Sequence, residues 1–197
     1  MRAFIGRLGL LFAFVVAGNS IVCEVCRSWD GIYCSGQLET CGKSVKSCQI
    51  SISELRGEHE KPIYNVFKNC SEPAAKSAVY RVAMVGTSYQ KVVHVCREDG
   101  CNKLDLQFQP NNSTLNGVKC PSCYAKDETS CEMEDIINCT GDMTRCIFVA
   151  ATFRLTEGPP FRIAYKACAN LKNIGQFPVV PTETIHGITA LKLNEGL

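Results

Sequence analysis

The sequence predicts an all-β, disulfide-rich protein that contains two copies of one small unit. All 14 cysteines lie after residue 20 of the 197-residue chain, and an even number of them in an exported chain favours a disulfide framework. The cysteine spacing occurs twice along the chain. Between the cysteines, short segments alternate apolar and polar residues, and no long segment has the pattern and caps of a helix.

Residues 1–20 are predicted to be a secretory signal peptide. An apolar run of 10 residues, LGLLFAFVVA, follows two arginines and precedes three small or polar residues that end at Ser20. The run is too short to span a bilayer, so a signal anchor is the weaker alternative. Cleavage near Ser20 makes a secreted, extracellular protein the expected product.

The rest of the chain argues against a membrane anchor and against nucleic acid as a partner. No later stretch approaches a membrane span, and the final residues, PTETIHGITALKLNEGL, lack the hydrophobic segment of a lipid-anchor signal, so we expect no membrane anchor. The formal net charge of +2 includes two leader arginines, which leaves the mature chain near neutral. Without a basic stripe, no nucleic acid is expected as a partner.

The spacing between consecutive cysteines reveals the repeat. From Cys23 the gaps are 2, 7, 6, 6 and 21 residues, and from Cys120 they are 2, 7, 7, 6 and 21, at an offset of 97 to 98. Residues 21–108 form the first repeat and residues 119–170 the second repeat, with the polar residues 109–118 as linker. Burial of apolar surface alone leaves a unit of this size only marginally stable. A disulfide that closes a loop of about 30 residues adds roughly 3 to 4 kcal/mol to the free energy of unfolding.

Three β-hairpins are predicted from alternating segments that flank charged or turn-rich stretches. The paired segments are residues 49–53 with 62–69, 79–85 with 90–96, and 145–153 with 161–168.

The first repeat resembles the three-finger domain of the lymphocyte-antigen-6/urokinase-receptor superfamily, because its eight cysteines open with Cys-x2-Cys and close with CREDGCN. The resemblance implies two tandem three-finger, snake-toxin-like domains, in which a disulfide-rich palm holds three β-loops. Sequence alone permits many pairings. The resemblance implies the following ones: Cys23 with Cys48, Cys26 with Cys34, Cys41 with Cys70, Cys96 with Cys101, Cys120 with Cys146, Cys123 with Cys131, and Cys139 with Cys168.

The same resemblance assigns a structural role to Asn102. In the family, the asparagine after the last cysteine binds backbone near the start of the domain, which suits an amide that both donates and accepts. The full family pattern has a further bridge, whose two positions hold Lys76 and Val95 here. Both halves are missing together, as in first domains of the urokinase-receptor type.

The second repeat departs from the pattern. The offset would place its closing cysteines near 194 and 199, but residue 194 is asparagine and the sequence runs to Leu197. We therefore expect the second repeat to be a partial domain without its C-terminal finger and closing disulfide. Residues 171–197 are expected to be an atypical C-terminal tail.

The phrases NGVKCPSC, NCTGDMTRC and RIAYKACA resemble the gamma-type phospholipase A2 inhibitors of blood plasma and their mammalian relatives, over about residues 21–170. This resemblance implies a secreted, non-enzymatic glycoprotein that binds a secreted phospholipase A2 and inhibits it by forming a protein–protein complex. The alternatives are a soluble three-finger ligand or modulator of a cell-surface receptor, and a truncated product that misfolds. Homo-oligomerisation is left open.

Catalytic and metal chemistry are not expected. The two Cys-x2-Cys pairs lie 97 residues apart, each at the start of its own repeat, whereas zinc-ribbon pairs lie about 15 to 20 residues apart. A redox motif of this kind requires a βαβ context. The three histidines, His59, His94 and His186, have no nucleophile elbow or zinc-helix motif near them. We expect no enzyme activity, no cofactor and no metal.

Four asparagines lie in glycosylation sequons: Asn69, Asn111, Asn112 and Asn138. The linker pair is favoured, because the other two adjoin cysteines of the palm, where access is expected to be poor. Trp29 and Tyr33 lie in the short loop CRSWDGIYC. Both are candidates for a partner contact, but for Trp29, the single tryptophan of the chain, packing on the palm is the favoured interpretation.

Overall fold

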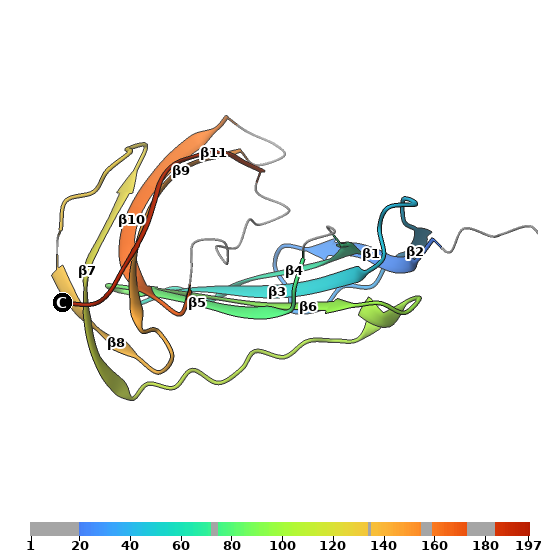
Figure 1. The fold of residues 1–197 in the computed structure, drawn as a ribbon, viewed down its shortest axis with the longest axis horizontal. Coiled ribbons are helices and arrows are strands. Elements are labelled where there is room, and N and C mark those ends of the chain that lie inside the picture. Colours follow the sequence, from blue (N-terminus) through green and yellow to red (C-terminus); the bar gives the residue numbers. More distant parts are fainter. Residues whose placement is uncertain (1–19, 72–74, 134, 155–158, 173–183) are drawn as a thin grey trace, which may run out of the picture.

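The computed structural model describes residues 20–71, 75–133, 135–154, 159–172 and 184–197 (Figure 1). The predicted signal peptide therefore lies outside the described residues, except for Ser20. Apart from one short 3-10 helix, the regular secondary structure of the described residues is β-strand, which confirms the predicted all-β class. None of their helices is long and apolar enough to cross a membrane.

The first repeat contains six strands and a short 3-10 helix, η1. They are β1 (Val22–Ser28), β2 (Gln37–Thr40), β3 (Cys48–Gly57), β4 (Ile63–Cys70), β5 (Ala78–Met84), β6 (Thr87–Cys96) and η1 (Cys101–Lys103). The later residues form β7 (Leu115–Lys126), β8 (Asp135–Thr140), β9 (Arg145–Arg154), β10 (Phe161–Ala169) and β11 (Thr184–Asn194). The three predicted hairpins are confirmed as the antiparallel pairs β3/β4, β5/β6 and β9/β10.

All strands belong to one antiparallel sheet. Its order is β11-β9-β10-β5-β6-β3-β4-β1-β2, with β7 pairing β10 and β8 off this path. The two repeats meet where β10 pairs β5, through Cys168 opposite Ala83 and Ala169 opposite Val82. In Figure 1, β1 to β6 lie in a flat layer, and the strands of the second repeat curve away from one end of it.

A hydrophobic core spans the boundary between the repeats. Val82 of β5 packs with residues of β9, β10 and the segment after β10, which are Ile147, Val149, Ala151, Ala167, Ala169 and Leu171. Each palm forms its own smaller core from cysteine side chains, around Cys23 and Cys48 in the first repeat and around Cys120 and Cys168 in the second. Burying apolar surface on both repeats at once couples their folding.

The tail differs from its prediction. Residues 184–194 form β11, which pairs with β9 where the second repeat was expected to lack its C-terminal finger. This part of the expectation is wrong: the strand is present, and its Leu191 and Leu193 pack against the core that includes Ile147 and Val149 of β9. The absence of cysteine after Cys168 does exclude a closing disulfide within this sequence.

The first strand of the second repeat begins earlier in the chain than predicted. Strand β7 begins at Leu115, inside residues 109–118, which were assigned to the linker. The residues between η1 and β7 run alongside the flat layer of the first repeat (Figure 1). The division of the chain into domains at residues 109–118 stays a prediction.

Candidate functional site

The palm of each repeat is built from disulfides. The structure pairs all of its cysteines, and the pairs are those that the family resemblance implies: Cys23–Cys48, Cys26–Cys34, Cys41–Cys70, Cys96–Cys101, Cys120–Cys146, Cys123–Cys131 and Cys139–Cys168. Neighbouring disulfides touch, since the Cys23 and Cys41 sulfurs lie 3.2 Å apart and those of Cys120 and Cys139 lie 3.3 Å apart. The palms are therefore compact, covalently fixed bases for the loops.

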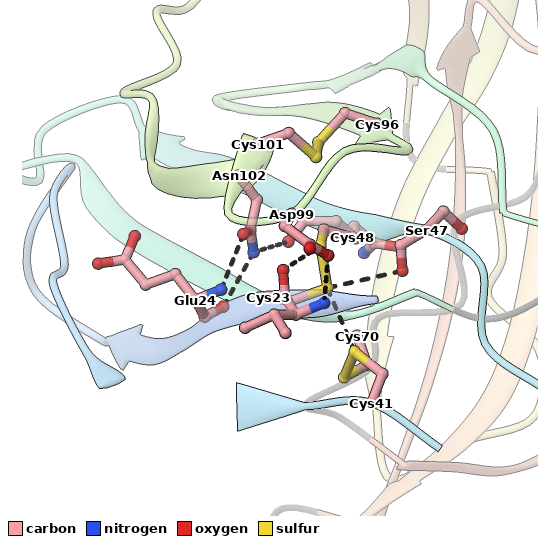
Figure 2. The surroundings of a disulfide bond; sticks show 12 residues. Cys23, Glu24, Cys41, Ser47, Cys48, Cys70, Cys96, Asp99, Cys101 and Asn102 are labelled. Atoms are coloured by element: carbon pink, nitrogen blue, oxygen red, sulfur yellow. Dashed lines mark hydrogen bonds between the residues drawn. A yellow bond between two sulfur atoms is a disulfide. The ribbon is translucent and has the colours of Figure 1, made fainter. Parts of the chain in front are cut away.

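Asn102 closes the first palm (Figure 2). Its side chain is 0% exposed, and its Oδ1 accepts from the Glu24 N–H at 2.9 Å. Its Nδ2 donates to the carbonyls of Glu24 at 2.9 Å and Gln49 at 3.1 Å. One carboxamide thus satisfies three backbone groups on β1 and β3, in the place that the resemblance implies.

The loop before Asn102 adds two more bonds to β1. The Val22 N–H donates to Asp99 Oδ1 at 2.9 Å, and the Gly100 N–H donates to the Val22 carbonyl at 2.7 Å. Gly100 has a φ of 67°, a left-handed conformation that glycine adopts at low cost. The small loop closed by Cys96–Cys101 therefore joins the end of the first repeat to its beginning.

A serine stands beside the missing family bridge. The Ser77 hydroxyl accepts from the Val95 N–H at 2.9 Å and lies 3.5 Å from the Val95 carbonyl oxygen. Hydrogen bonds thus link the two segments whose positions Lys76 and Val95 carry no disulfide.

A buried ion pair joins β1 and β4. Lys68 Nζ donates to Glu24 Oε2 at 2.8 Å, and the two side chains are 2% and 6% exposed. Glu24 Oε1 also accepts from Gly36 N at 3.1 Å and Ser35 Oγ at 3.3 Å. Burial by itself raises the pKa of the Glu24 carboxyl, but these hydrogen bonds outweigh it and hold that pKa below its ordinary value. The pair joins β1 and β4 to the loop that leads into β2.

The second repeat has no equivalent of this ion pair. Pro121 occupies the position of Glu24, and Lys166 that of Lys68. Lys166 Nζ lies 6.0 Å from the centre of the Phe148 ring instead. The two palms share their disulfides but not their polar chemistry.

Sequence reasoning missed a polar joint between the repeats, centred on Asn170. Its Oδ1 accepts from the Arg81 N–H at 2.8 Å, and its Nδ2 donates to the Val79 carbonyl at 2.9 Å. Arg81 Nη1 donates to Asp142 Oδ2 at 2.7 Å, and Arg81 Nε donates to Asn111 Oδ1 at 3.1 Å. The joint thus links β5, the linker, the turn after β8 and the end of β10.

No sequence signal could have found this joint. Its members lie 28 to 91 residues apart and belong to different repeats, so neither cysteine spacing nor strand alternation places them together. A further bond, from the Val85 N–H to the buried Ser122 hydroxyl at 3.0 Å, brings the turn between β5 and β6 onto β7. The tip of the β5/β6 hairpin therefore takes part in the contact between the two repeats.

The first loop of the first repeat presents aromatic side chains. Trp29 is 48% exposed and Tyr33 is 62% exposed, so the favoured expectation that Trp29 packs on the palm is wrong. The Arg27 guanidinium carbon lies 3.3 Å from the centre of the Trp29 ring, a cation–π contact. Trp, Tyr and Arg are the residue types that dominate binding energy at protein interfaces.

The two histidines whose side chains are described, His59 and His94, lie in different parts of the first repeat. His59 is exposed in the turn beyond β3, whereas His94 lies in β6 opposite Ile50, toward the palm end of the sheet. The side chain of His186 lies outside the described residues. Among the described residues, the clusters of metal-ligand type are cysteines already bound in disulfides, Cys23 with Cys41 and Cys70, and Cys120 with Cys139 and Cys168.

The four sequon asparagines differ in exposure. Asn112 and Asn138 are exposed, although access at Asn138 was expected to be poor. Asn111 is exposed but binds Arg81, as described above. Asn69 is half-buried in β4, and its Oδ1 accepts from the Cys70 N–H at 2.7 Å.

Comparison with known proteins identifies relatives of this scaffold. The model of the u-PAR/Ly-6 domain matches residues 116–184. Phospholipase A2 inhibitor 1 of Protobothrops flavoviridis is 31% identical over 81% of this chain and 78% of its own length. Phospholipase A2 inhibitor LNF1 of Lachesis muta muta is 32% identical over 70% of this chain and 68% of its own length. Ly6/PLAUR domain-containing protein 8 of Bos taurus is 24% identical over 100% of this chain and 85% of its own length.

Proposed function

Because this chain belongs to the u-PAR/Ly-6 family, we propose that it is a secreted, non-enzymatic protein that inhibits an extracellular phospholipase A2 by binding to it, in the manner of a gamma-type inhibitor. The observation that carries the proposal is the similarity, at 31% and 32% identity, to two snake proteins that are named phospholipase A2 inhibitors. The resemblance noted in the sequence points to the same class.

The geometry supports a binding role. Disulfides hold the loops in one conformation, so little conformational entropy is lost when a partner is bound. Trp29 and Tyr33 lie on a loop of 7 residues between Cys26 and Cys34, which are themselves bridged. We assign these two exposed rings as a contact for the enzyme, whose lipid-facing surface or active-site mouth they would cover.

The test uses the purified secreted protein and a panel of secreted phospholipases A2. Complex formation is measured by size-exclusion chromatography, and inhibition by hydrolysis of phospholipid vesicles. We expect a complex and lost hydrolysis with at least one enzyme. Neither a complex nor lost activity with any enzyme of the panel would remove the proposal.

Variants locate the contact. Trp29→Ala combined with Tyr33→Ala is expected to weaken binding by a factor of about 30 or more, since truncating a hot-spot residue costs about 2 kcal/mol or more. Ile63→Ala is the matched control, because Ile63 is also exposed, at 55%, but lies on β4. Equal affinity of both variants would place the contact elsewhere on the molecule.

The alternative, a soluble ligand or modulator of a cell-surface receptor, predicts another partner. Affinity capture from plasma and from cell membranes separates the two: a phospholipase A2 in the first case and a membrane receptor in the second.

A further inference from the structure

We infer that the edge of β9 is a strand-binding site and that β11 is its built-in occupant, a third finger of the second repeat that is held without a disulfide. The register carries this inference. In the first repeat, β6 pairs with β3 so that Val92 lies opposite Ile52 and Cys96 opposite Cys48. In the second repeat, Ala190 lies opposite Ala150 and Asn194 opposite Cys146.

All of these positions are shifted by the same 98 residues. From Ala190 to Asn194, strand β11 therefore lies residue for residue where β6 lies, although its sequence lacks the closing cysteine. The tail that looks unrelated in sequence occupies the third-finger position.

Side chains on both faces of β9 define what the site accepts. Ile147 and Val149 belong to the core between the repeats, and Leu193 and Leu191, which lie opposite them, pack against that core. On the other face, Ala190 packs with the buried Ala150. The edge of β9 thus accepts an extended strand that has large apolar residues at the positions of Leu191 and Leu193 and a small residue at the position of Ala190.

The residues after β11 repeat the closing contact of the first repeat. There, the Gly100 N–H donates to the Val22 carbonyl at 2.7 Å. Here, the Leu197 N–H donates to the Lys119 carbonyl at 2.9 Å, and both positions are shifted by 97 residues. Gly196 is packed so closely that a Cβ would overlap Val118 Cγ1. The second repeat is thereby closed through hydrogen bonds and packing.

The two third-finger strands differ in how they are held. Strand β6 ends in the Cys96–Cys101 bridge, followed by the buried Asn102. Strand β11 has no covalent link to its neighbours, and the ion pair of Arg145 with Glu195 has side chains that are 37% and 86% exposed, which contributes little.

The register of β11 is also less regular. Its pairing with β9 shifts at two points, between Ile185 and Gly187 and between Ile188 and Ala190, whereas the ten pairs of β3 with β6 run without a shift. Strand β11 therefore opens more readily than β6, and its opening exposes the backbone edge of β9 to another strand.

Two measurements on the intact protein test this inference. In hydrogen exchange followed by mass spectrometry, amides of residues 184–194 are expected to exchange at least tenfold faster than those of residues 87–96. A labelled peptide of residues 184–197 is expected to bind the full chain by exchanging with β11. The matched control peptide carries Leu191→Asp and Leu193→Asp and is expected not to bind.

Variants of the full chain test the identity of the occupant. Leu191→Asp with Leu193→Asp is expected to remove protection from the β9 amides that face β11, whereas those that face β10 stay protected. Ile188→Asp, at a 43% exposed position of the same strand, is expected to leave both sets protected. Exchange in β11 as slow as in β6, no binding of the wild-type peptide, or protection of the β11-facing amides of β9 in the double variant would each overturn the inference. The first two results are obtained on the unaltered chain, so they stand even where the double variant is not secreted.

Discussion

The side chain of Asn170 binds the backbone of Arg81 across the boundary between the repeats, accepting from its N–H at 2.8 Å. Asn102 makes the same kind of contact with Glu24 inside the first repeat, at 2.9 Å. In both cases one carboxamide pairs with a strand as a neighbouring strand would, accepting from an N–H and donating to a carbonyl. The Asn102 carboxamide closes the first repeat, and the Asn170 carboxamide joins the two repeats.

Removal of the inter-repeat amide is expected to uncouple the repeats. Because the core around Val82 spans both, the wild-type protein is expected to unfold in one thermal transition. Asn170→Ala leaves the Arg81 N–H and Val79 carbonyl without this partner, at a cost of about 1 to 3 kcal/mol, and is expected to split the transition in calorimetry. Arg145→Ala, at an exposed ion pair, is the control, and a single unchanged transition in both variants would contradict the prediction.

Asn102→Ala is expected to destabilise the first repeat by about 2 to 4 kcal/mol, because three buried backbone groups lose their hydrogen bonds. Asn102→Asp is expected to be at least as harmful, since a carboxylate cannot donate to the carbonyls of Glu24 and Gln49. Urea denaturation without reductant measures the free energy of unfolding. Asn194→Ala, at an exposed position, is expected to stay within about 0.5 kcal/mol of wild type.

Stability is expected to fall in acid through Glu24. Its pKa is lower in the folded protein than in the unfolded chain, so its contribution is complete above the ordinary value of 4.5 and is lost as the pH falls through the folded pKa. Glu24→Gln leaves the buried Lys68 ammonium with the exposed Asp105 carboxylate, 3.9 Å away, as its acidic partner, and is expected to cost about 3 kcal/mol at pH 7.

The measurement for Glu24 is the free energy of unfolding from pH 7 to pH 3. The slope in the acid range is expected to decrease in Glu24→Gln and to persist in Glu39→Gln, an exposed position on β2. The same acid slope in wild type and Glu24→Gln would show that other carboxyls cause it.

Substitution of Gly36 and of Gly42 by alanine is expected to have different effects on stability. A Cβ at Gly36 would overlap the Val25 carbonyl oxygen and lie 2.8 Å from Cys26 Cβ, whereas a Cβ at Gly42 would have nothing within 4 Å. Gly36→Ala is expected to destabilise the protein by about 2 kcal/mol or more and to lower its secreted yield, because backbone must move. Gly42→Ala is expected to change stability by less than about 1 kcal/mol. Equal melting temperatures of the two variants would argue against the close approach at Gly36.

N-linked glycans are expected on the exposed Asn112 and Asn138 and not on the half-buried Asn69. Asn111 is expected to stay unmodified, because its carboxamide binds Arg81 in the joint. Enzymatic deglycosylation in ¹⁸O water followed by peptide mass spectrometry marks each occupied asparagine. Asn112→Gln is expected to remove the mark from the linker peptide, and a mark on Asn69 would contradict the prediction.

The local parts of the fold could be predicted because their information is local. Segments 49–53 with 62–69 and 145–153 with 161–168 alternate in a two-residue period, which only a strand places on one face. The role of Asn102 was implied by the resemblance to the three-finger family, in which an asparagine directly follows the last cysteine. The exposure of Trp29 and Tyr33 could not, because a loop between two bridged cysteines gives no pattern that separates packing from exposure.

By itself the sequence determined the three hairpins and the repeat, since alternation and cysteine spacing act over short distances along the chain. Only the tertiary structure decided that β10 pairs with β5, that Asn170 reaches Arg81, and that β11 fills the edge of β9. These contacts join segments between about 30 and 90 residues apart. They arise because exposed strand edges and apolar faces must be covered, and which segment covers them depends on the shape of the assembled sheet.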